Sequence, residues 1–387
     1  MKSSVVLFVL ACVFFASVPQ ASALPKFASR IGAKCQACHV NPTGKGMRNT
    51  LGSTYGREEL PMRTYKTVLD TSEDGKAKFT KEDVTNLEDF STNLTPFFSY
   101  GADFRNLYFY DGKSKGTSFF QMQGDLYFDL RINKTFRVYL DKGLYSGFEV
   151  FGLAKVLPLD GYIKVGKFIP AYGMKLDDHN AYIRGGPYLG GPSTGLRFSQ
   201  RSEDTGIELG IAPSIFTLNV GVFNGTIGNN SGSPDISLSK VVSARGDATI
   251  QSDKVNFNFG GSFYNDPSST SKAQFYGVFG SISAFKSLTL ISEVDYAKIS
   301  PTGKEVTGIA FYSEANYMIM EGVDAKVGYE FFDPDKDQQT GTYTRITVGA
   351  EFFVMSGVEL RPLYRFNREK PVEVKNDEFD FMFHFFL

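Results

Sequence analysis

The sequence predicts an all-β protein: an antiparallel transmembrane β-barrel of about 16 strands, preceded by a short N-terminal segment. Three observations point to this fold. The chain holds 37 Phe, 20 Tyr and 39 Gly but no Trp among 387 residues. From about residue 96 onward, apolar and polar residues alternate along many stretches. No run of 18 apolar residues follows the N-terminal region, so strands rather than helices are expected to cross a membrane.

The first 23 residues have the pattern of a secretory signal peptide. Lys2 gives a positive start, residues 5–18 are apolar, and Ala21-Ser22-Ala23 forms an A-x-A cleavage site. The apolar run is short for a spanning helix and ends in small residues, which favours removal over a membrane anchor. Removal also takes away Cys12, so the mature chain keeps two cysteines.

Residues 24–62 carry the strongest chemical motif of the chain. Cys35-Gln36-Ala37-Cys38-His39 is a C-x-x-C-H sequence, the signature of covalent c-type haem attachment. Each thiol can bond to a haem vinyl group, and the imidazole is then the proximal iron ligand. A disulfide between the cysteines is an alternative. Zinc usually takes four protein ligands, and a thioredoxin-like pair needs a βαβ context. We therefore expect one haem c held by Cys35, Cys38 and His39.

The sixth ligand of the haem iron is open at this stage, because Met, His or water would serve. Met47 and Met62 are nearest in sequence, and Met47 is the candidate. The other histidines are His179 and His384. Residues 24–62 are short for an independent cytochrome domain, so we expect the barrel lumen to help enclose the haem.

Residues 63–95 are polar and predict a periplasmic linker, and residues 96–387 predict the barrel. Period-two alternation is clear in 118–132, 254–263 and 323–331. A soluble sandwich also alternates but turns its apolar face inward, whereas a barrel turns it to lipid. In residues 118–132 one predicted face holds Phe120, Met122, Leu126, Phe128, Leu130 and Ile132, and the other holds Gln121, Gln123, Asp125, Asp129 and Arg131.

The last predicted strand, residues 378–387, is rich in aromatic residues on one face, which resembles the assembly signal of bacterial outer-membrane proteins. His384 alternates with these residues, so we expect it in the lumen. Short turns such as 133–134 and 321–322 should face the periplasm. Longer loops at 265–272, 333–341 and 367–377 should face outward. The face shared in the last strand consists of Phe379, Phe381, Phe383, Phe385 and Leu387.

The stretch from Gly166 to Gly191 predicts a long irregular loop. It resembles a segment of phosphate-selective-type porins, and such a loop either folds into the pore or reaches outside. Asp177, Asp178 and His179 lie together in it. Two carboxylates beside an imidazole can bind a divalent metal, which makes them a candidate Fe(II) site. The alternative is an ordinary solvated loop.

The whole pattern resembles the fused monohaem cytochrome–porins, whose best-known members are iron-oxidising outer-membrane cytochromes. The residues that carry this resemblance are Pro25-Lys26-Phe27-Ala28, Gly32 and the C-x-x-C-H motif. Leu51-Gly52-Ser53-Thr54-Tyr55-Gly56-Arg57 stands where such proteins often have a Phe-Gly-Arg-like segment. Asn41-Pro42-Thr43-Gly44 departs from the iron oxidisers.

The resemblance implies an electron conduit in the bacterial outer membrane. An extracellular donor such as Fe(II) would reduce the haem, and a periplasmic c-type cytochrome would collect the electron. The haem segment would lie in the periplasm or in the lumen. A passive diffusion porin with a haem-bearing plug, and electron export to extracellular acceptors, are the alternatives. Whether the chain acts as an Fe(II)-oxidising enzyme stays open. Outer-membrane lipid is an expected partner, but 41 basic against 42 acidic residues give no reason to expect nucleic acid.

Overall fold

The computed structural model describes 25–62, 65–71, 77–83, 92–144, 147–176, 178, 180–185, 203–225, 236, 238–267, 272–300, 305–338 and 341–387. The predicted signal peptide lies outside these residues. So do Asp177 and His179 of the candidate Fe(II) loop. No helix among the described residues is long and apolar enough to cross a membrane.

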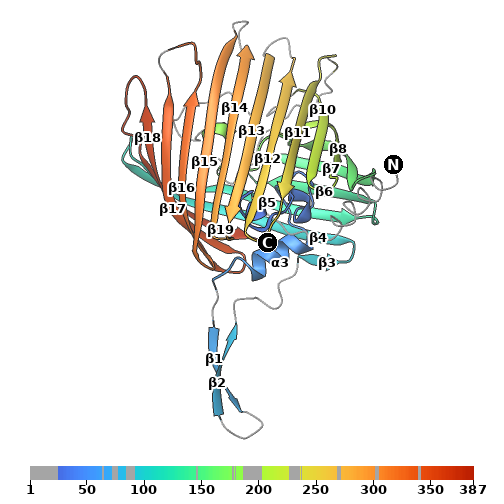
Figure 1. Ribbon diagram of the computed structural model, residues 1–387, viewed down its shortest axis with the longest axis vertical. Helices are drawn as coiled ribbons and strands as arrows, with labels where there is room; N and C mark the ends of the chain where they lie inside the picture. Colours follow the sequence, from blue (N-terminus) through green and yellow to red (C-terminus); the bar gives the residue numbers. More distant parts are fainter. Residues whose placement is uncertain are drawn as a thin grey trace, which may run out of the picture.

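Sixteen antiparallel strands in the described part of the chain form a closed barrel (Figure 1). The last strand pairs with the first barrel strand, with Phe385 opposite Phe104, and this pairing closes the sheet. The predicted fold class and strand number are therefore confirmed. The short β3 (Asn93–Thr95) pairs with the start of β4. The barrel strands are β4 (Phe98–Asp111), β5 (Gly116–Arg131), β6 (Phe136–Gly143), β7 (Phe148–Leu157), β8 (Gly161–Phe168), β9 (Asp204–Ile211), β10 (Phe216–Phe223), β11 (Val241–Ile250), β12 (Val255–Asp266), β13 (Lys272–Ala284), β14 (Leu288–Ser300), β15 (Val306–Met320), β16 (Val323–Asp333), β17 (Tyr343–Met355), β18 (Val358–Glu369) and β19 (Glu378–Phe386).

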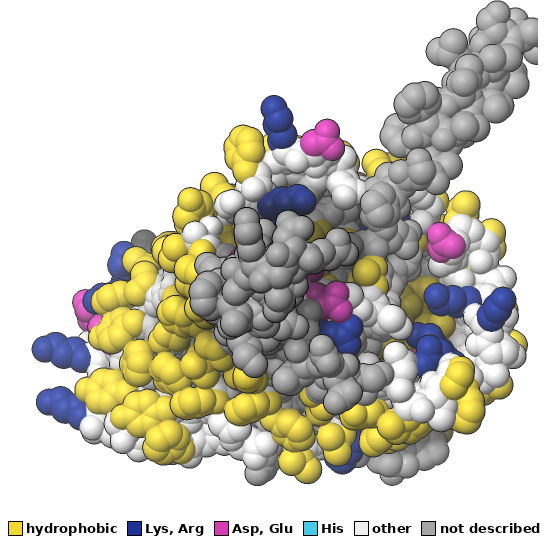
Figure 2. Space-filling view, turned by 90° about the horizontal axis from the view of Figure 1, so that it is seen from below, with side chains coloured by type: hydrophobic (Ala, Val, Ile, Leu, Met, Phe, Trp, Pro, Cys, Tyr) yellow, Lys and Arg dark blue, Asp and Glu magenta, His cyan; other side chains and the backbone are white. Residues whose placement is uncertain are grey.

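The barrel is polar inside and apolar outside. Along β12, Phe257 and Phe259 are exposed, while Asn256 and Ser262 are buried, as the alternation predicts. Figure 2 shows hydrophobic side chains spread over the outside of the barrel. Closure of the sheet pairs every strand on both sides, and the apolar face then meets lipid.

The predicted pattern fails at one end of β5, from Phe120 to Met122. Phe120 is opposite the buried Leu107, so it shares the inner face, and Gln121 is opposite Asn106 on the outer face. The alternation placed Met122 outward with Phe120, but Met122 is only 8% exposed and packs against Leu107 and Met382. The β4–β5 register shifts there, since Arg105 pairs with Gln123 and Asn106 with Gln121. Met122 is the extra residue of a β-bulge, which reverses the parity of the strand.

The connections divide between the two ends of the barrel as expected. The turns at 133–134 and 321–322 join β5 to β6 and β15 to β16, at one end. The strand ends that border the longer connections, between β12 and β13, β16 and β17, and β18 and β19, lie at the opposite end. We call the first the short-turn end.

The N-terminal segment, residues 25–62, occupies the short-turn end. It consists of α2 (Pro25–Ile31), the 3₁₀ turn η1 (Cys35–Ala37) and α3 (Thr50–Glu58), visible at this end in Figure 1. Asn49 caps α3, because its side chain accepts from Gly52 N at 3.1 Å. Turn and strand-end residues bind the segment: Gln251 donates to Ile31 O (3.1 Å) and Ser356 donates to Arg57 O (2.7 Å).

The predicted linker contains a small sheet of its own. Here β1 (Tyr65–Thr71) and β2 (Ala77–Asp83) pair as an antiparallel hairpin. Figure 1 shows this hairpin beyond the short-turn end of the barrel.

Candidate functional site

A cavity lies between the N-terminal segment and the inner wall of the barrel. Its empty space is about 1370 Å³, counting the part open to solvent. Three parts of the chain line it: the N-terminal segment with Cys35 and His39, the loop after β8 with Tyr172, Met174 and Lys175, and the wall with Asp103, Arg105 and Arg245.

The C-x-x-C-H motif forms a single tight turn at this cavity. His39 N donates to Cys35 O at 3.1 Å, and Cys38 N donates to the same oxygen at 3.2 Å. Cys35 is partly exposed and lines the cavity, whereas Cys38 is 0% exposed. Helix α3 lies against Cys38, since a Cβ on Gly52 would be 2.9 Å from Cys38 Cβ. The thiols are not joined by a disulfide. The structure therefore brings Cys35 and His39 to the cavity and buries Cys38.

His39 is held in its neutral form. Burial, and to a smaller extent the nearby Arg48 guanidinium, lower the pKa of His39 to about 4. Backbone hydrogen bonds to Gly46, Met47 and Lys45 oppose this shift. A neutral imidazole is the form that binds metals. A haem iron beside His39 fits this side chain.

Basic side chains outnumber acidic ones around the cavity. Lys175 is partly buried, with its amine 3.5 Å from Pro170 O. Desolvation lowers the pKa of Lys175 to about 7, with Glu149 opposing the shift, so the positive charge of the lining comes mainly from the arginines. A haem carries two propionate groups, and a cationic lining compensates them. The basic lining residues are Lys34, Lys45, Arg48, Arg105, Lys175, Arg184 and Arg245, and the acidic ones are Asp103, Asp178 and Asp247.

Met47, the ligand candidate from the sequence, packs against the wall of the barrel. Its backbone N–H donates to Tyr139 Oη at 3.0 Å. Its Cγ lies 3.4 Å from the position that a Cβ on Gly101 would take. Met47 is absent from the described residues that line the cavity. Its role as an iron ligand stays a prediction.

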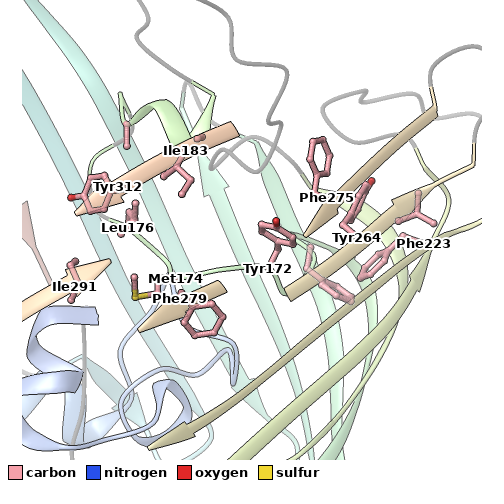
Figure 3. Close-up of a cluster of buried hydrophobic side chains, with 14 of the residues drawn as sticks. Tyr172, Met174, Leu176, Ile183, Phe223, Tyr264, Phe275, Phe279, Ile291 and Tyr312 are labelled. Carbon is pink, nitrogen blue, oxygen red and sulfur yellow. The ribbon is translucent and has the colours of Figure 1, made fainter. Parts of the chain in front are cut away.

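The loop after β8 folds into the lumen (Figure 3), which decides between the two expectations for it. Wall side chains bind its backbone at several points. Ser243 donates to Ala171 O at 2.7 Å, and Gly173 N donates to Ser262 Oγ at 2.8 Å. We call residues 169–185 the inward loop. Its apolar side chains join a buried cluster inside the barrel, formed with Phe223, Tyr264, Phe275, Phe279, Ile291 and Tyr312.

Asp178, in the inward loop, has an ionic partner. Its Oδ2 lies 3.0 Å from Arg365 Nη2, and both side chains are buried. Asp177 and His179 lie outside the described residues. The described residues contain no group of three His, Cys, Asp or Glu placed to hold a metal ion. The candidate Fe(II) site therefore stays a prediction.

His384 lies in the lumen, as its alternation with Phe383 predicts. Its Nδ1 is 2.7 Å from Glu359 Oε2, and its Nε2 is 3.2 Å from Asp103 Oδ1. Both ring nitrogens thus face carboxylates.

Met174 and Lys175 are among the cavity residues that were not singled out from the sequence. Met174 and Lys175 belong to a stretch without periodicity, and no local motif marks them. Only the inward course of the loop brings them to Cys35 and His39.

Comparison with known structures identifies the barrel architecture. OmpT of Vibrio cholerae aligns over 75% of this chain and 99% of its own, with 14% identity and a TM-score of 0.54. The chain has a porin fold. The anion-selective porin from Comamonas acidovorans (75% and 99% coverage, 11% identity, TM-score 0.52) is similar, as is Salmonella typhi OmpF in complex with daunomycin (75% and 97%, 11%, 0.53).

These identities establish the fold alone. The porin-like barrel indicates an outer-membrane location with lipid around its apolar face. No protein-family model and no curated protein matches the chain. The porin part of the expected resemblance therefore stands, and the cytochrome part is taken up below as a proposal.

Proposed function

We propose that this protein is an outer-membrane electron conduit in which a monohaem cytochrome segment sits inside a porin barrel. Cys35 and Cys38 would attach one haem c, with His39 as proximal ligand. The observation that carries the proposal is the C-x-x-C-H turn at a large, positively lined lumen cavity. When bound, haem supplies one-electron chemistry, at a potential set by its axial ligands and burial.

The barrel wall holds the N-terminal segment in place through charge. Lys26 of α2 pairs with Glu351, and Arg30 Nη2 lies 3.0 Å from Asp324 Oδ2. Lys45 faces an acidic part of the wall, and Glu149 and Asp141 there raise its pKa. Each of these contacts sets a cation of the segment against a carboxylate of the wall. Buried pairs of this kind are costly to break, so the motif has a defined position relative to the bilayer.

The two ends of the barrel give each redox partner its side of the membrane. The segment lies at the short-turn end, which porin topology assigns to the periplasm. A periplasmic c-type cytochrome would dock there. An extracellular donor such as Fe(II) would approach through the long-loop end. The inward loop and the segment both occupy the lumen, which supports a conduit more than a pore for free diffusion.

The test is the absorption spectrum of the purified protein before and after addition of Fe(II), then of dithionite. We expect a covalent c-type haem that Fe(II) reduces. A haem that only dithionite reduces would point to another donor or to electron export. The matched control, Cys35→Ser with Cys38→Ser, should fold as a barrel without covalent haem. Absence of haem from the unaltered protein would sink the proposal.

Replacement of His39 separates a conduit from a passive porin. With His39→Ala, a conduit loses Fe(II)-dependent reduction while the barrel keeps its ion conductance in planar bilayers. If reduction by Fe(II) continued at the original rate, His39 would not be the proximal ligand.

A further inference from the structure

A short antiparallel bridge sorts the residues around the haem motif between two faces. His39 and Arg48 are bridge partners, and Val40 N donates to Met47 O at 3.0 Å. Opposed residues in such a bridge share a face, and neighbours along each chain point to opposite faces. His39 and Arg48 line the cavity, whereas Val40 and Met47 do not. Val40 and Met47 belong to the buried cluster that also includes Tyr139 and Met174, so it is the lining of the cavity that separates Met174 from Met47. Met47 therefore points away from the side that His39 presents.

Another methionine lies at the cavity beside the motif. Met174 of the inward loop lines the same cavity as Cys35 and His39. Its neighbour Lys175 reaches the motif: a Cβ on Gly44 would lie 3.7 Å from Lys175 Cγ and 3.4 Å from Cys35 Cβ. Figure 3 shows Met174 in the inward loop, among the buried side chains inside the barrel.

The backbone at Met174 is clamped from both sides. Met174 N donates to Glu293 Oε2 at 2.8 Å, and Met174 O accepts from Arg184 Nη2 at 2.6 Å. Arg184 Nη2 also donates to Glu293 Oε2 at 2.6 Å. Gly173 permits this approach, because it has φ +51° and a Cβ there would overlap the Glu293 carboxylate. Because the backbone is held from both sides, the side chain of Met174 starts from a fixed position. This preorganises its thioether to act as a ligand.

We propose that Met174 is the sixth ligand of the haem iron, with His39 as the proximal ligand. The inference rests on the proposed function, since it requires the haem. A thioether suits haem iron, and His–Met ligation raises the reduction potential. It also carries no titratable proton, so the ligand is available across the physiological pH range. The inward loop would then complete the haem site as well as narrow the lumen.

The experiment compares purified holoproteins: unaltered, Met174→Leu, Met174→His and the matched control Met47→Leu. Three quantities are measured: covalent haem content, the far-red charge-transfer band of methionine-ligated ferric haem, and the midpoint potential. The unaltered protein and Met47→Leu should show the band. Met174→Leu should lose it, with a lower potential and the same haem content. Met174→His should give a low-spin bis-histidine spectrum without the band.

Three results would overturn the assignment while leaving the haem in place: no band in the unaltered protein, a band that survives Met174→Leu, or a band lost in Met47→Leu alone. Lack of covalent haem in every variant, the unaltered protein included, would instead contradict the proposed function. Heat-modifiable migration on gels checks that each barrel is folded. If Met174→Leu does not fold, Met174→His decides by its spectrum.

Discussion

Two segments occupy the barrel lumen, and they are held in different ways. The N-terminal segment uses its own charged side chains, with Arg30 against Asp324 as an example. The inward loop is bound through its backbone as well, to wall side chains such as Ser243, Ser262 and Glu293. It also has ion pairs of its own, from Arg184 to Glu293 and from Asp178 to Arg365. The backbone contacts fix the course of the loop, and the ion pairs add to the attachment of both segments.

The strongest test of this difference is Arg184→Met. Arg184 lies 2.6 Å from Glu293 and 3.6 Å from Asp295, and its removal leaves two buried carboxylates without their cation. Breaking a buried pair costs about 3–5 kcal/mol, at least about a hundredfold in loop occupancy. We expect a larger single-channel conductance in planar bilayers. Arg184→Lys is the control. It keeps a cation at this position, so its conductance should stay close to that of the unaltered protein. Unchanged conductance would show that the loop does not need this clamp.

Next in size is Arg30→Met, which removes the partner of Asp324. A single buried pair is lost, so we expect a cost near 3 kcal/mol, at the low end of the range for such pairs. The cost should appear as release of the N-terminal segment. Limited trypsin digestion in detergent should cleave at Lys34 and Lys45 in the variant, while the inward loop stays protected. Equal protection of both proteins would mean that the segment is held by other contacts.

The outer face gives a change that should affect neither lumen segment. Val278 on β13 is 71% exposed and predicted to face lipid. Lysine at the bilayer midplane of a barrel costs about 2–4 kcal/mol. Val278→Lys should lower barrel stability in urea titrations in lipid, with haem content unchanged. The control Phe285→Lys, in the β13–β14 turn, should cost about 0–1 kcal/mol. Equal losses of stability in Val278→Lys and Phe285→Lys would contradict a bilayer interior at Val278 and an interface at Phe285.

The smallest effect is expected at the surface of α3. Arg57 and Glu58 form an ion pair at 2.7 Å, but both side chains are partly exposed. Exposed pairs contribute about 0–1 kcal/mol. Arg57→Ala should therefore leave trypsin protection of the N-terminal segment unchanged, in contrast to Arg30→Met. If Arg57→Ala released the N-terminal segment as much as Arg30→Met does, the exposure of an ion pair would not predict its contribution to stability.

Local patterns were enough to predict the barrel and the haem motif. Period-two alternation depends only on neighbouring residues where a strand has no bulge, so the inward side of His384 and the outward side of Phe257 could be predicted without knowing strand partners. The inward side of Met122 could not be predicted in this way, because the bulge depends on how β4 and β5 pair. Met47 was the candidate ligand because it is near the motif in sequence. Nearness in sequence does not show whether its side chain lies on the same face as His39.

By itself, the sequence determined the strand pattern, the barrel class and the position of Cys35, Cys38 and His39 in the chain. Only the tertiary structure decided that the inward loop enters the lumen and that Met174 and His39 line the same cavity. The physical reason is that alternation and the C-x-x-C-H spacing are properties of a few neighbouring residues. The meeting of His39 and Met174 depends on closure of the whole sheet and on wall residues such as Glu293 that bind the loop.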